Sequence, residues 1–305
     1  WYGVVENDPG SFALISIAGN AIAGRITTSR GKLYVITALG QDSYRVSELD
    51  PTKFGETEND FIVPDIREPG PPAAGDCPDP STNIDVMIVY TAAARTGAGG
   101  QDQMVALIYE CIYLANLSYQ NSNISQRLNL VHFEEVTYTE SGDGYTDLVT
   151  LRGTSDGTID NIHTLRDTYS ADLVTMLVET LNANGIAYVM ENVGNSFAPY
   201  AFSVVRRSNA AASLTYPHEL GHNMGARHDC TSDATIGKPH DYDHGYFVSS
   251  PADGGQSWRT VMSYNNCTTS PCLRIPYFSN PNLAYSPTGS TTTDPMGTAS
   301  SPGTC

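Results

Sequence analysis

The stretch HELGHNMGARHD, residues 218–229, restricts more than any other segment what this chain can fold into. His218 and His222 are four positions apart, so on a helix they lie on one face and both imidazoles can reach one ion. Gly225 follows where a helix can end in a left-handed turn, which glycine adopts at little cost. The chain can then reverse and present His228 from outside the helix.

This spacing predicts a catalytic metal centre. Three nitrogen ligands leave one position of a tetrahedral zinc ion open, which distinguishes a catalytic site from a structural one. Glu219 stands beside the first histidine, where a carboxylate can act as general base on a water activated by the metal. We therefore expect His218, His222 and His228 to bind one zinc ion and Glu219 to transfer protons.

A second motif, TVMSY at 260–264, follows the third histidine. Together the two motifs resemble the metzincin clan of zinc endopeptidases, and most closely its secreted, bacterial-type reprolysin (adamalysin)-like enzymes. The segments IDVMIVYT (84–91) and RIPYFSNP (274–281), with Asp229 after the third histidine, carry the closer resemblance. The resemblance covers roughly Ile84 to Tyr285.

The resemblance implies an α/β (α+β) catalytic domain with a mostly parallel, twisted sheet, one antiparallel edge strand, an active-site helix and a Met-turn. It implies that Met262 packs beneath the three imidazoles, that Gly225 reverses the chain and that Asp229 anchors the site from behind the ligands. Tyr264 instead resembles a tyrosine of astacins and serralysins that can ligate zinc and stabilise the oxyanion. The same role is predicted for Tyr264.

Composition divides the chain into three parts. Residues 1–63 contain short β-rich runs separated by turn residues, which predicts a small β-rich domain. Residues 64–83 are dense in proline and glycine and predict an exposed, cleavable linker. Residues 84–305 alternate buried apolar runs with helical patterns, which favours crossover connections and a largely parallel sheet. We interpret residues 1–63 as a propeptide domain and residues 84–305 as the catalytic domain.

The linker contains a candidate zinc-blocking residue. A Cys77 thiolate is a strong zinc ligand and would displace the catalytic water in a latent proenzyme. Asp76 is the alternative ligand, because astacin-like propeptides use an aspartate after glycine and Gly75 precedes it. A disulfide from Cys77, for example to Cys111, is a third possibility.

Two features suggest how a substrate would bind. The run PYAFSVV (199–205) alternates, and its leading proline suits an edge strand, so Tyr200, Phe202 and Val204 are predicted to line the substrate strand. Arg274, after the Met-turn, would favour an acidic side chain following the cut; the alternative is an ordinary surface arginine.

Charge and cysteine content limit the partners. The chain has 305 residues, and its 16 basic and 33 acidic side chains give a net charge of −17, which argues against nucleic acid and anionic membranes as partners. The six cysteines favour an oxidising, secreted location, with Cys267–Cys272 and Cys230–Cys305 as candidate disulfides and Cys111 as a buried thiol. We expect a monomer that acts on proteins or peptides and binds its own propeptide, with a structural calcium ion as a further possibility.

Together these features predict a secreted zinc endopeptidase in a latent form. Two rivals are a catalytically silent binding or adhesion module with the same fold, and a zinc hydrolase of a non-peptide substrate. The intact Glu219 argues against the first rival, and the predicted edge strand argues against the second.

Overall fold

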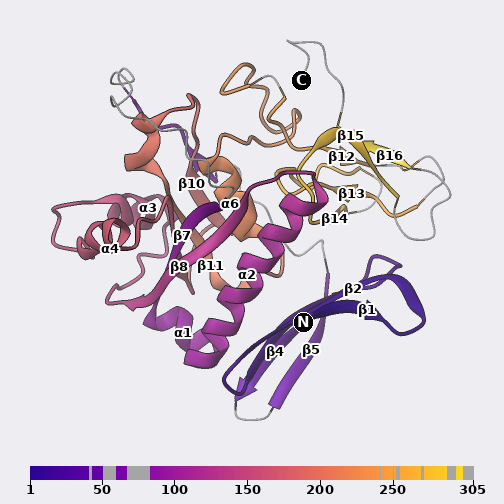
Figure 1. Cartoon of the computed structure of the whole chain (residues 1–305), viewed down its shortest axis with the longest axis horizontal. Coiled ribbons are helices and arrows are strands. Elements are labelled where there is room, and N and C mark those ends of the chain that lie inside the picture. The colour runs from indigo at the N-terminus through magenta and orange to yellow at the C-terminus, as the bar shows by residue number, and fades with distance from the viewer. Residues whose placement is uncertain are drawn as a thin grey trace.

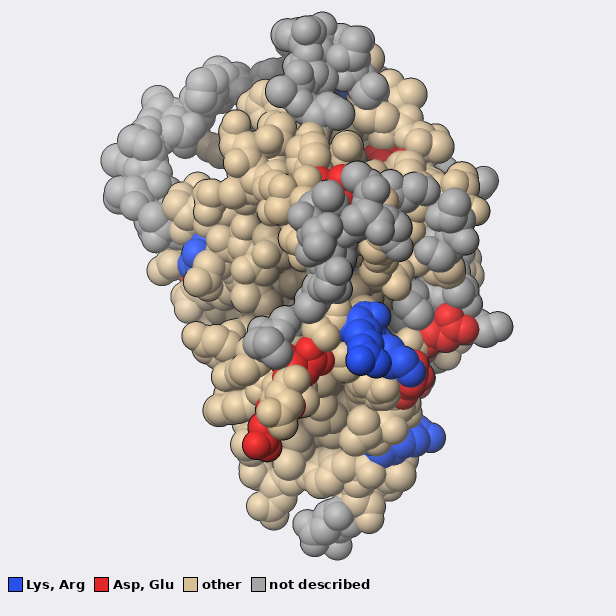
Figure 2. Space-filling model, turned by 90° about the vertical axis from the view of Figure 1, so that its right-hand side faces the viewer, with Lys and Arg blue, Asp and Glu red and all other residues tan. Residues whose placement is uncertain are grey.

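The computed structural model describes residues 1–40, 43–50, 60–66, 83–240, 242–249, 251, 255–268, 271–286 and 293–297. Within them the chain forms a mixed α/β structure, as predicted. Figure 1 shows an N-terminal sheet beside the long helix α2, a central sheet on the other side of that helix, and a C-terminal group of short strands. Charged side chains are few on the face in Figure 2 and lie among uncharged residues.

The N-terminal sheet is an antiparallel meander of five strands in the order of the chain. Its tight turns occur where the sequence has turn residues. Gly19, for instance, lies in the turn between two paired strands and has a φ of +54°. The strands are β1 (Tyr2–Val5), β2 (Asp8–Ala18), β3 (Ala21–Thr27), β4 (Leu33–Gly40) and β5 (Ser43–Leu49).

The central sheet has the strand order β6-β10-β11-β9-β7-β8. Neighbouring strands among β11, β9, β7 and β8 are parallel, and β10 runs antiparallel to β11. The apolar runs of the sequence form these strands because helices or loops cover both faces, so both alternating sets of side chains are buried. The strands are β6 (Phe61–Ile62), β7 (Asn83–Thr91), β8 (Arg127–Val136), β9 (Leu173–Val178), β10 (Gly185–Tyr188) and β11 (Phe202–Arg206).

The edge strand is not the predicted one. Tyr200 ends the 3₁₀ helix η2 (Asn195–Tyr200), while Phe202 and Val204 belong to β11 and are fully buried between β10 and β9. Pro199 lies in η2, outside the strand, so its missing N–H removes no hydrogen bond from the sheet. The prediction that Tyr200, Phe202 and Val204 lie on an edge strand is therefore wrong. The antiparallel strand near this edge of the sheet is β10, which pairs with β11 on one side and with the short β6 on the other.

Six helices connect these strands in the described part of the chain. They are α1 (Ala92–Ala98), α2 (Gln101–Asn121), α3 (Gly144–Arg152), α4 (Asn161–Tyr169), α5 (Arg207–Ala210) and α6 (Thr215–Asn223). The longest, α2, contacts β2 and β3 of the N-terminal sheet as well as α6 and β8. No helix among the described residues is both long and apolar enough to cross a membrane.

Short strands follow the last helix and pack around Trp258. They are β12 (Phe247–Val248), β13 (Trp258–Arg259), β14 (Leu273–Arg274), β15 (Asn280–Tyr285) and β16 (Asp294–Met296). The predicted disulfide Cys267–Cys272 is present and closes the loop before β14. Cys230 is disulfide-bonded, although its predicted partner Cys305 lies outside the described residues. Cys111 is a buried free thiol, as predicted.

The contact between the N-terminal sheet and α2 encloses two charged side chains. Arg25 on β3 is 3% exposed and Glu110 on α2 is 2% exposed. Burial raises the pKa of Glu110 to about 7, against the opposing effect of the Arg25 charge. The folded protein therefore binds a proton at Glu110 more readily than the unfolded chain does, and this carboxylate destabilises the fold once it ionises.

We predict that Glu110→Gln stabilises the protein increasingly as the pH rises. Because the pKa of this group is higher in the folded state, the parent chain loses stability as pH rises from the unfolded value toward about 7. The advantage of the variant in free energy of unfolding should grow by about 2 kcal/mol between pH 5 and pH 8. Urea unfolding of both proteins at the two pH values measures this.

The exposed Glu6→Gln serves as the matched control and should show no such growth. An advantage of Glu110→Gln that is equal at both pH values would contradict the assignment of the raised pKa to Glu110.

Candidate metal centre

Helix α6 positions the first two histidines. It begins at Thr215, so Pro217 falls in the first turn, where its missing N–H breaks no helical hydrogen bond. All nine residues of the helix are buried. His218 and His222 therefore project from one face of a fully enclosed helix into the interior of the protein.

The chain reverses after α6 through Gly225. This glycine has a φ of +91°, and a Cβ there would lie 2.6 Å from Pro239 Cγ, so both backbone and space require glycine. Ala226 N–H then donates to Gly221 O, which satisfies a carbonyl at the helix end. The reversal brings His228 back toward the helix, with its Nε2 3.1 Å from His222 Nε2.

Two backbone carbonyls orient the helical imidazoles. His218 Nδ1 lies 2.8 Å from Val261 O, and His222 Nδ1 lies 2.9 Å from Ala226 O. A carbonyl can only accept, so each Nδ1 carries the proton and each Nε2 keeps its lone pair for another partner. Burial lowers the pKa of His218 to about 3 and also lowers the pKa of His222. Both rings are thus held in the neutral form that binds metals.

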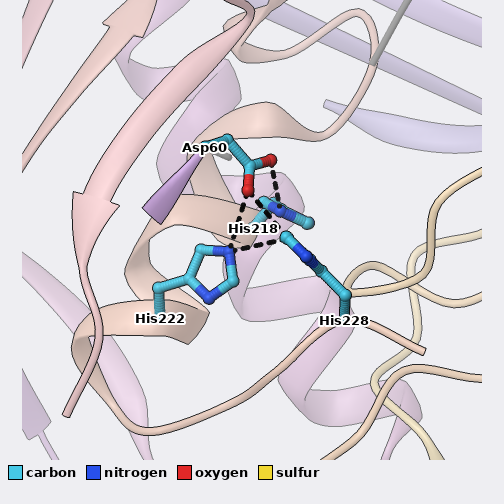
Figure 3. A group of neighbouring side chains, drawn as sticks. All are labelled: Asp60, His218, His222 and His228. Atoms are coloured by element: carbon cyan, nitrogen blue, oxygen red, sulfur yellow. Dashed lines mark hydrogen bonds and ion pairs between the residues drawn. The ribbon is translucent and has the colours of Figure 1, made fainter. Parts of the chain in front are cut away.

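A carboxylate from the N-terminal region occupies the centre of the three rings. Asp60 Oδ2 lies 3.2 Å from His218 Nε2, and Asp60 Oδ1 lies 2.8 Å from His228 Nε2 and 3.6 Å from His222 Nε2 (Figure 3). Burial raises the pKa of Asp60, but its interactions with the rings of His228, His218 and His222 outweigh burial and hold that pKa well below its ordinary value. The carboxylate is therefore ionised at the point where the rings converge.

The donor atoms fit a zinc ion. Three imidazole nitrogens and one carboxylate oxygen lie within 4.8 Å of one another in a buried space. Their lone pairs converge on one point, an arrangement that a bound cation stabilises, and three nitrogens with one oxygen suit tetrahedral zinc. No second such group of histidine, cysteine or acidic side chains occurs in the described ranges, so the expected calcium site receives no support.

Glu219 lies beside this centre with a buried carboxylate. Among the described residues neither of its side-chain oxygens has a hydrogen-bond partner, and the residue is 1% exposed. A Cβ on Gly185 would lie 2.3 Å from Glu219 Oε1, so the glycine at the start of β10 leaves room for the carboxylate. Burial raises the pKa of Glu219 well above its ordinary value, the negative charge of Asp60 raises it further, and Arg274 opposes both.

Asp229 ties the third histidine to the Met-turn. Its Oδ2 accepts hydrogen bonds from Tyr264 N–H at 2.9 Å and from Ser263 Oγ at 3.1 Å. Its Oδ1 accepts a further bond from Asn266 Nδ2 at 2.9 Å. The residue directly after His228 is thus fixed to the loop that passes beneath the metal centre.

Met262 and Tyr264 each pack against an element that carries the zinc-ligating histidines. Met262 is buried against α6, and a Cβ on Gly221 would lie 2.4 Å from its Sδ. The Tyr264 ring packs against the His228 ring with centroids 4.0 Å apart. Both residues therefore touch the elements that carry the three histidines, as the Met-turn motif suggested.

The segment that carries Asp60 also covers the edge of the central sheet. Strand β6 pairs in parallel with β10, with Phe61 opposite Ala187. Ala187 N–H donates to Asp60 O at 3.0 Å and Val189 N–H donates to Ile62 O at 2.9 Å. The Phe61 ring packs against His222 at a centroid distance of 5.0 Å. Residues 60–62 thus fill both the metal centre and the adjacent strand edge.

Arg274 is not a surface arginine. It is 8% exposed and donates to Ser213 O at 3.0 Å and to Ser263 O at 3.1 Å. These carbonyls lie just before α6 and in the Met-turn, so the guanidinium links the two elements. Its charge also acts on Glu219 and His218.

Sequence reasoning missed Asp60. The two predicted zinc-blocking residues, Cys77 and Asp76, belong to the linker and lie outside the described residues. Asp60 stands in the segment NDFIVP, where an acid precedes a short apolar run that can extend a sheet edge. This pattern could have indicated Asp60, but it is too short to distinguish this segment from many others in proteins.

The reprolysin profile of metallo-peptidase family M12 matches residues 81–279. The chain belongs to this family. A peptidyl-Asp metalloendopeptidase of Stenotrophomonas maltophilia strain K279a is 36% identical over 97% of this chain and 67% of that protein. The protein of the same name from Xanthomonas campestris pv. campestris is 33% identical over 96% of this chain and 66% of its own length. The chain thus spans about two thirds of these relatives.

Family membership and these relatives show that the chain is a zinc metalloendopeptidase. Its matched segment includes the three histidines, Glu219 and the Met-turn, and excludes Asp60 and the sheet β1–β5. The segment that matches the family and the carboxylate at its metal centre therefore come from different regions of one chain.

Proposed function

We propose that this chain is a latent, secreted zinc endopeptidase whose residue Asp60 blocks the metal. The observation that carries the proposal is the Asp60 carboxylate among His218, His222 and His228. The proposal assigns residues 1–63 to a propeptide, 64–83 to a cleavable linker and 84–305 to the catalytic domain. The Cys267–Cys272 disulfide supports an oxidising, secreted location.

His218, His222 and His228 would hold the zinc ion, which would supply Lewis acidity and a water of lowered pKa. Glu219 would accept the proton of the attacking water on a carboxylate oxygen and deliver it to the leaving amine. Its buried carboxylate, whose oxygens have no hydrogen-bond partner among the described residues, is available for this exchange. Tyr264, packed on His228, is the candidate for stabilising the oxyanion.

A peptide substrate would bind along β10 rather than along the strand first predicted. The backbone N–H groups of Ala187 and Val189 now donate to residues 60–62. Once that segment leaves, the same groups are free to pair with an extended peptide by strand addition. The blocking segment and the substrate therefore compete for both the metal and the strand edge.

Glu219→Gln should abolish proteolysis while leaving the fold and the zinc content unchanged. Loss of a general base reduces the rate by about 10²- to 10⁴-fold. The measurement is kcat/KM on an unfolded protein after the linker has been cut, together with zinc analysis of the purified variant. Unchanged proteolysis by this variant would rule out the proposed mechanism.

Asp60→Asn should make the uncut chain active. The neutral amide keeps the size of the side chain but binds zinc far more weakly than a carboxylate, so the segment should release the metal more readily. Activity of the uncut variant on an unfolded protein should rise several-fold above that of the uncut parent, toward the level after cutting within residues 64–83.

Asp65→Asn is the matched control, because Asp65 is exposed three residues beyond β6. Cys77→Ala and Asp76→Ala test the two linker residues in the same assay. Activation by either linker variant, with Asp60→Asn still latent, would move the blocking role from Asp60 to the linker.

We further propose that the enzyme cuts beside acidic residues, with Arg274 selecting them. The relatives carry the name peptidyl-Asp metalloendopeptidase. In this chain the buried Arg274 guanidinium lies between Ser213, just before α6, and Ser263 of the Met-turn. Its charge interacts there with Glu219. A buried positive charge so close to the catalytic carboxylate would attract a substrate carboxylate and disfavour a basic side chain.

Arg274→Gln should lower the preference for aspartate. In a pair of peptides that differ only by aspartate or alanine following the cut, the ratio of kcat/KM values should fall at least tenfold. The ratio is the appropriate readout, because a general loss of folding lowers both values equally. Arg274→Lys should retain part of the preference, and an unchanged ratio in Arg274→Gln would assign specificity to another residue.

A further inference from the structure

The two faces of β10 lie against different helices. A Cβ on Gly185 would lie 2.3 Å from Glu219 Oε1, so this residue faces α6. A Cβ on Gly144 of α3 would lie 3.1 Å from Ile186 Cγ2, so the next residue of β10 faces α3. Because side chains alternate along a strand, Tyr188 faces α3 as well. A peptide bound along β10 would therefore direct alternate side chains toward α6 and toward α3.

Residues 60–62 show which side of the sheet a bound peptide presents at Tyr188. Phe61 packs against His222, so its side chain lies on the α6 side. Ile62 follows it and pairs with Tyr188, so the Ile62 side chain lies on the α3 side. When this segment leaves, a peptide residue opposite Tyr188 would direct its own side chain to the same place.

Arg152, the last residue of α3, lies beside that place. Its guanidinium carbon is 5.8 Å from the centroid of the Tyr188 ring and 4.2 Å from the centroid of the Tyr200 ring. Its Nε donates to Pro199 O at 3.2 Å. Burial raises the pKa of Tyr188 and the Arg152 charge opposes this, so the guanidinium also lies near the phenol oxygen. These contacts hold the guanidinium at the end of β10.

The Arg152 charge has no acidic partner among the described residues. The two aromatic rings and the backbone carbonyl that contact it are all neutral. Acidic side chains are not scarce, since the chain has 33 of them against 16 basic ones, and Arg207 for comparison pairs with Glu179. Pro199 O takes only the Nε–H of the five guanidinium donors, so the two Nη groups can still bind a carboxylate in a bidentate contact.

A third phenol completes this surface. Tyr145, near the start of α3, is 60% exposed, and its phenol lies close enough to act on the pKa of Tyr188. Phenol hydroxyls donate hydrogen bonds to carboxylates, and the aromatic rings provide apolar contact for the carbons of a glutamate or aspartate side chain. One cation and three tyrosines therefore lie together on the α3 side of β10.

We propose that Arg152 selects a second acidic side chain of the substrate, at the peptide residue that lies opposite Tyr188. A carboxylate there would pair with the Arg152 guanidinium and accept a hydrogen bond from a neighbouring phenol. Arg274 lies elsewhere, between the segment before α6 and the Met-turn, so the two arginines act on different side chains of one peptide. The inference rests on the proposed function, because it assumes that the peptide binds along β10.

The test uses the zinc-loaded enzyme after cleavage within residues 64–83. In the peptides aspartate is fixed after the cut, and glutamate is exchanged for glutamine at each of the other positions near the cut in turn. At one position the parent enzyme should have a kcat/KM about fivefold higher for glutamate, as for a partly exposed ion pair. Arg152→Gln should abolish that preference. Added salt should weaken it in the parent enzyme but have no such effect in the variant.

Three further variants separate the charge from a folding defect. Arg152→Lys should keep part of the preference, and Tyr145→Phe should lower it less than Arg152→Gln does. Arg127→Gln removes an arginine from β8, at the opposite edge of the central sheet, and should leave the preference unchanged. The ratio of two kcat/KM values does not depend on the amount of folded enzyme, so a loss of stability alone cannot change it.

The two proposals fail in different ways. An enzyme that cuts these peptides but prefers glutamate at none of the scanned positions overturns the role of Arg152 and leaves the proposed function intact. A preference that persists in Arg152→Gln does the same. An enzyme that cuts no peptide at all would overturn the proposed function, and the role of Arg152 with it.

Discussion

The convergence of three imidazoles on one carboxylate is the interaction on which the rest of this structure depends. The Nδ1 atoms of His218 and His222 are hydrogen-bonded to the carbonyls of Val261 and Ala226. These bonds fix the orientation of both rings and therefore the direction in which each Nε2 points. His228 meets them from the reversed chain, and Asp60 fills the space between. The contact joins Asp60 to a histidine that lies 158 positions later in the chain.

The same contact explains why the N-terminal region remains on the catalytic part of the chain. Residues 60–62 extend the central sheet at β10 and place Asp60 at the metal centre in one continuous segment. The sheet β1–β5 adds a second, independent contact: β2 and β3 pack against α2, and Arg25 on β3 donates to the carbonyl of Ala211 just before α6. The first contact places a carboxylate among the three histidines, whereas the second joins the sheet to α2 and to the segment before α6.

Buried charge is distributed unevenly around the active centre. Asp60 and Glu219 are buried at the metal centre, and Arg274 is buried between the segment before α6 and the Met-turn. The Arg274 charge acts on Glu219. The sequence could not show this, because burial of a side chain depends on the tertiary packing.

The sequence by itself determined the chemistry and most of the core. The spacing of His218, Glu219, His222 and His228 follows from helical periodicity, and Gly225 from the rarity of positive φ, so local rules were sufficient. The strands β7 and β9 were likewise predicted from their continuous apolar runs, which are a local feature of the sequence. Only the tertiary structure decided that β10 rather than β11 is the antiparallel strand at the margin, and that Asp60 reaches the zinc ligands. Strand order and long-range contacts depend on how distant segments pack, and no local pattern encodes which of several acids will lie opposite three histidines.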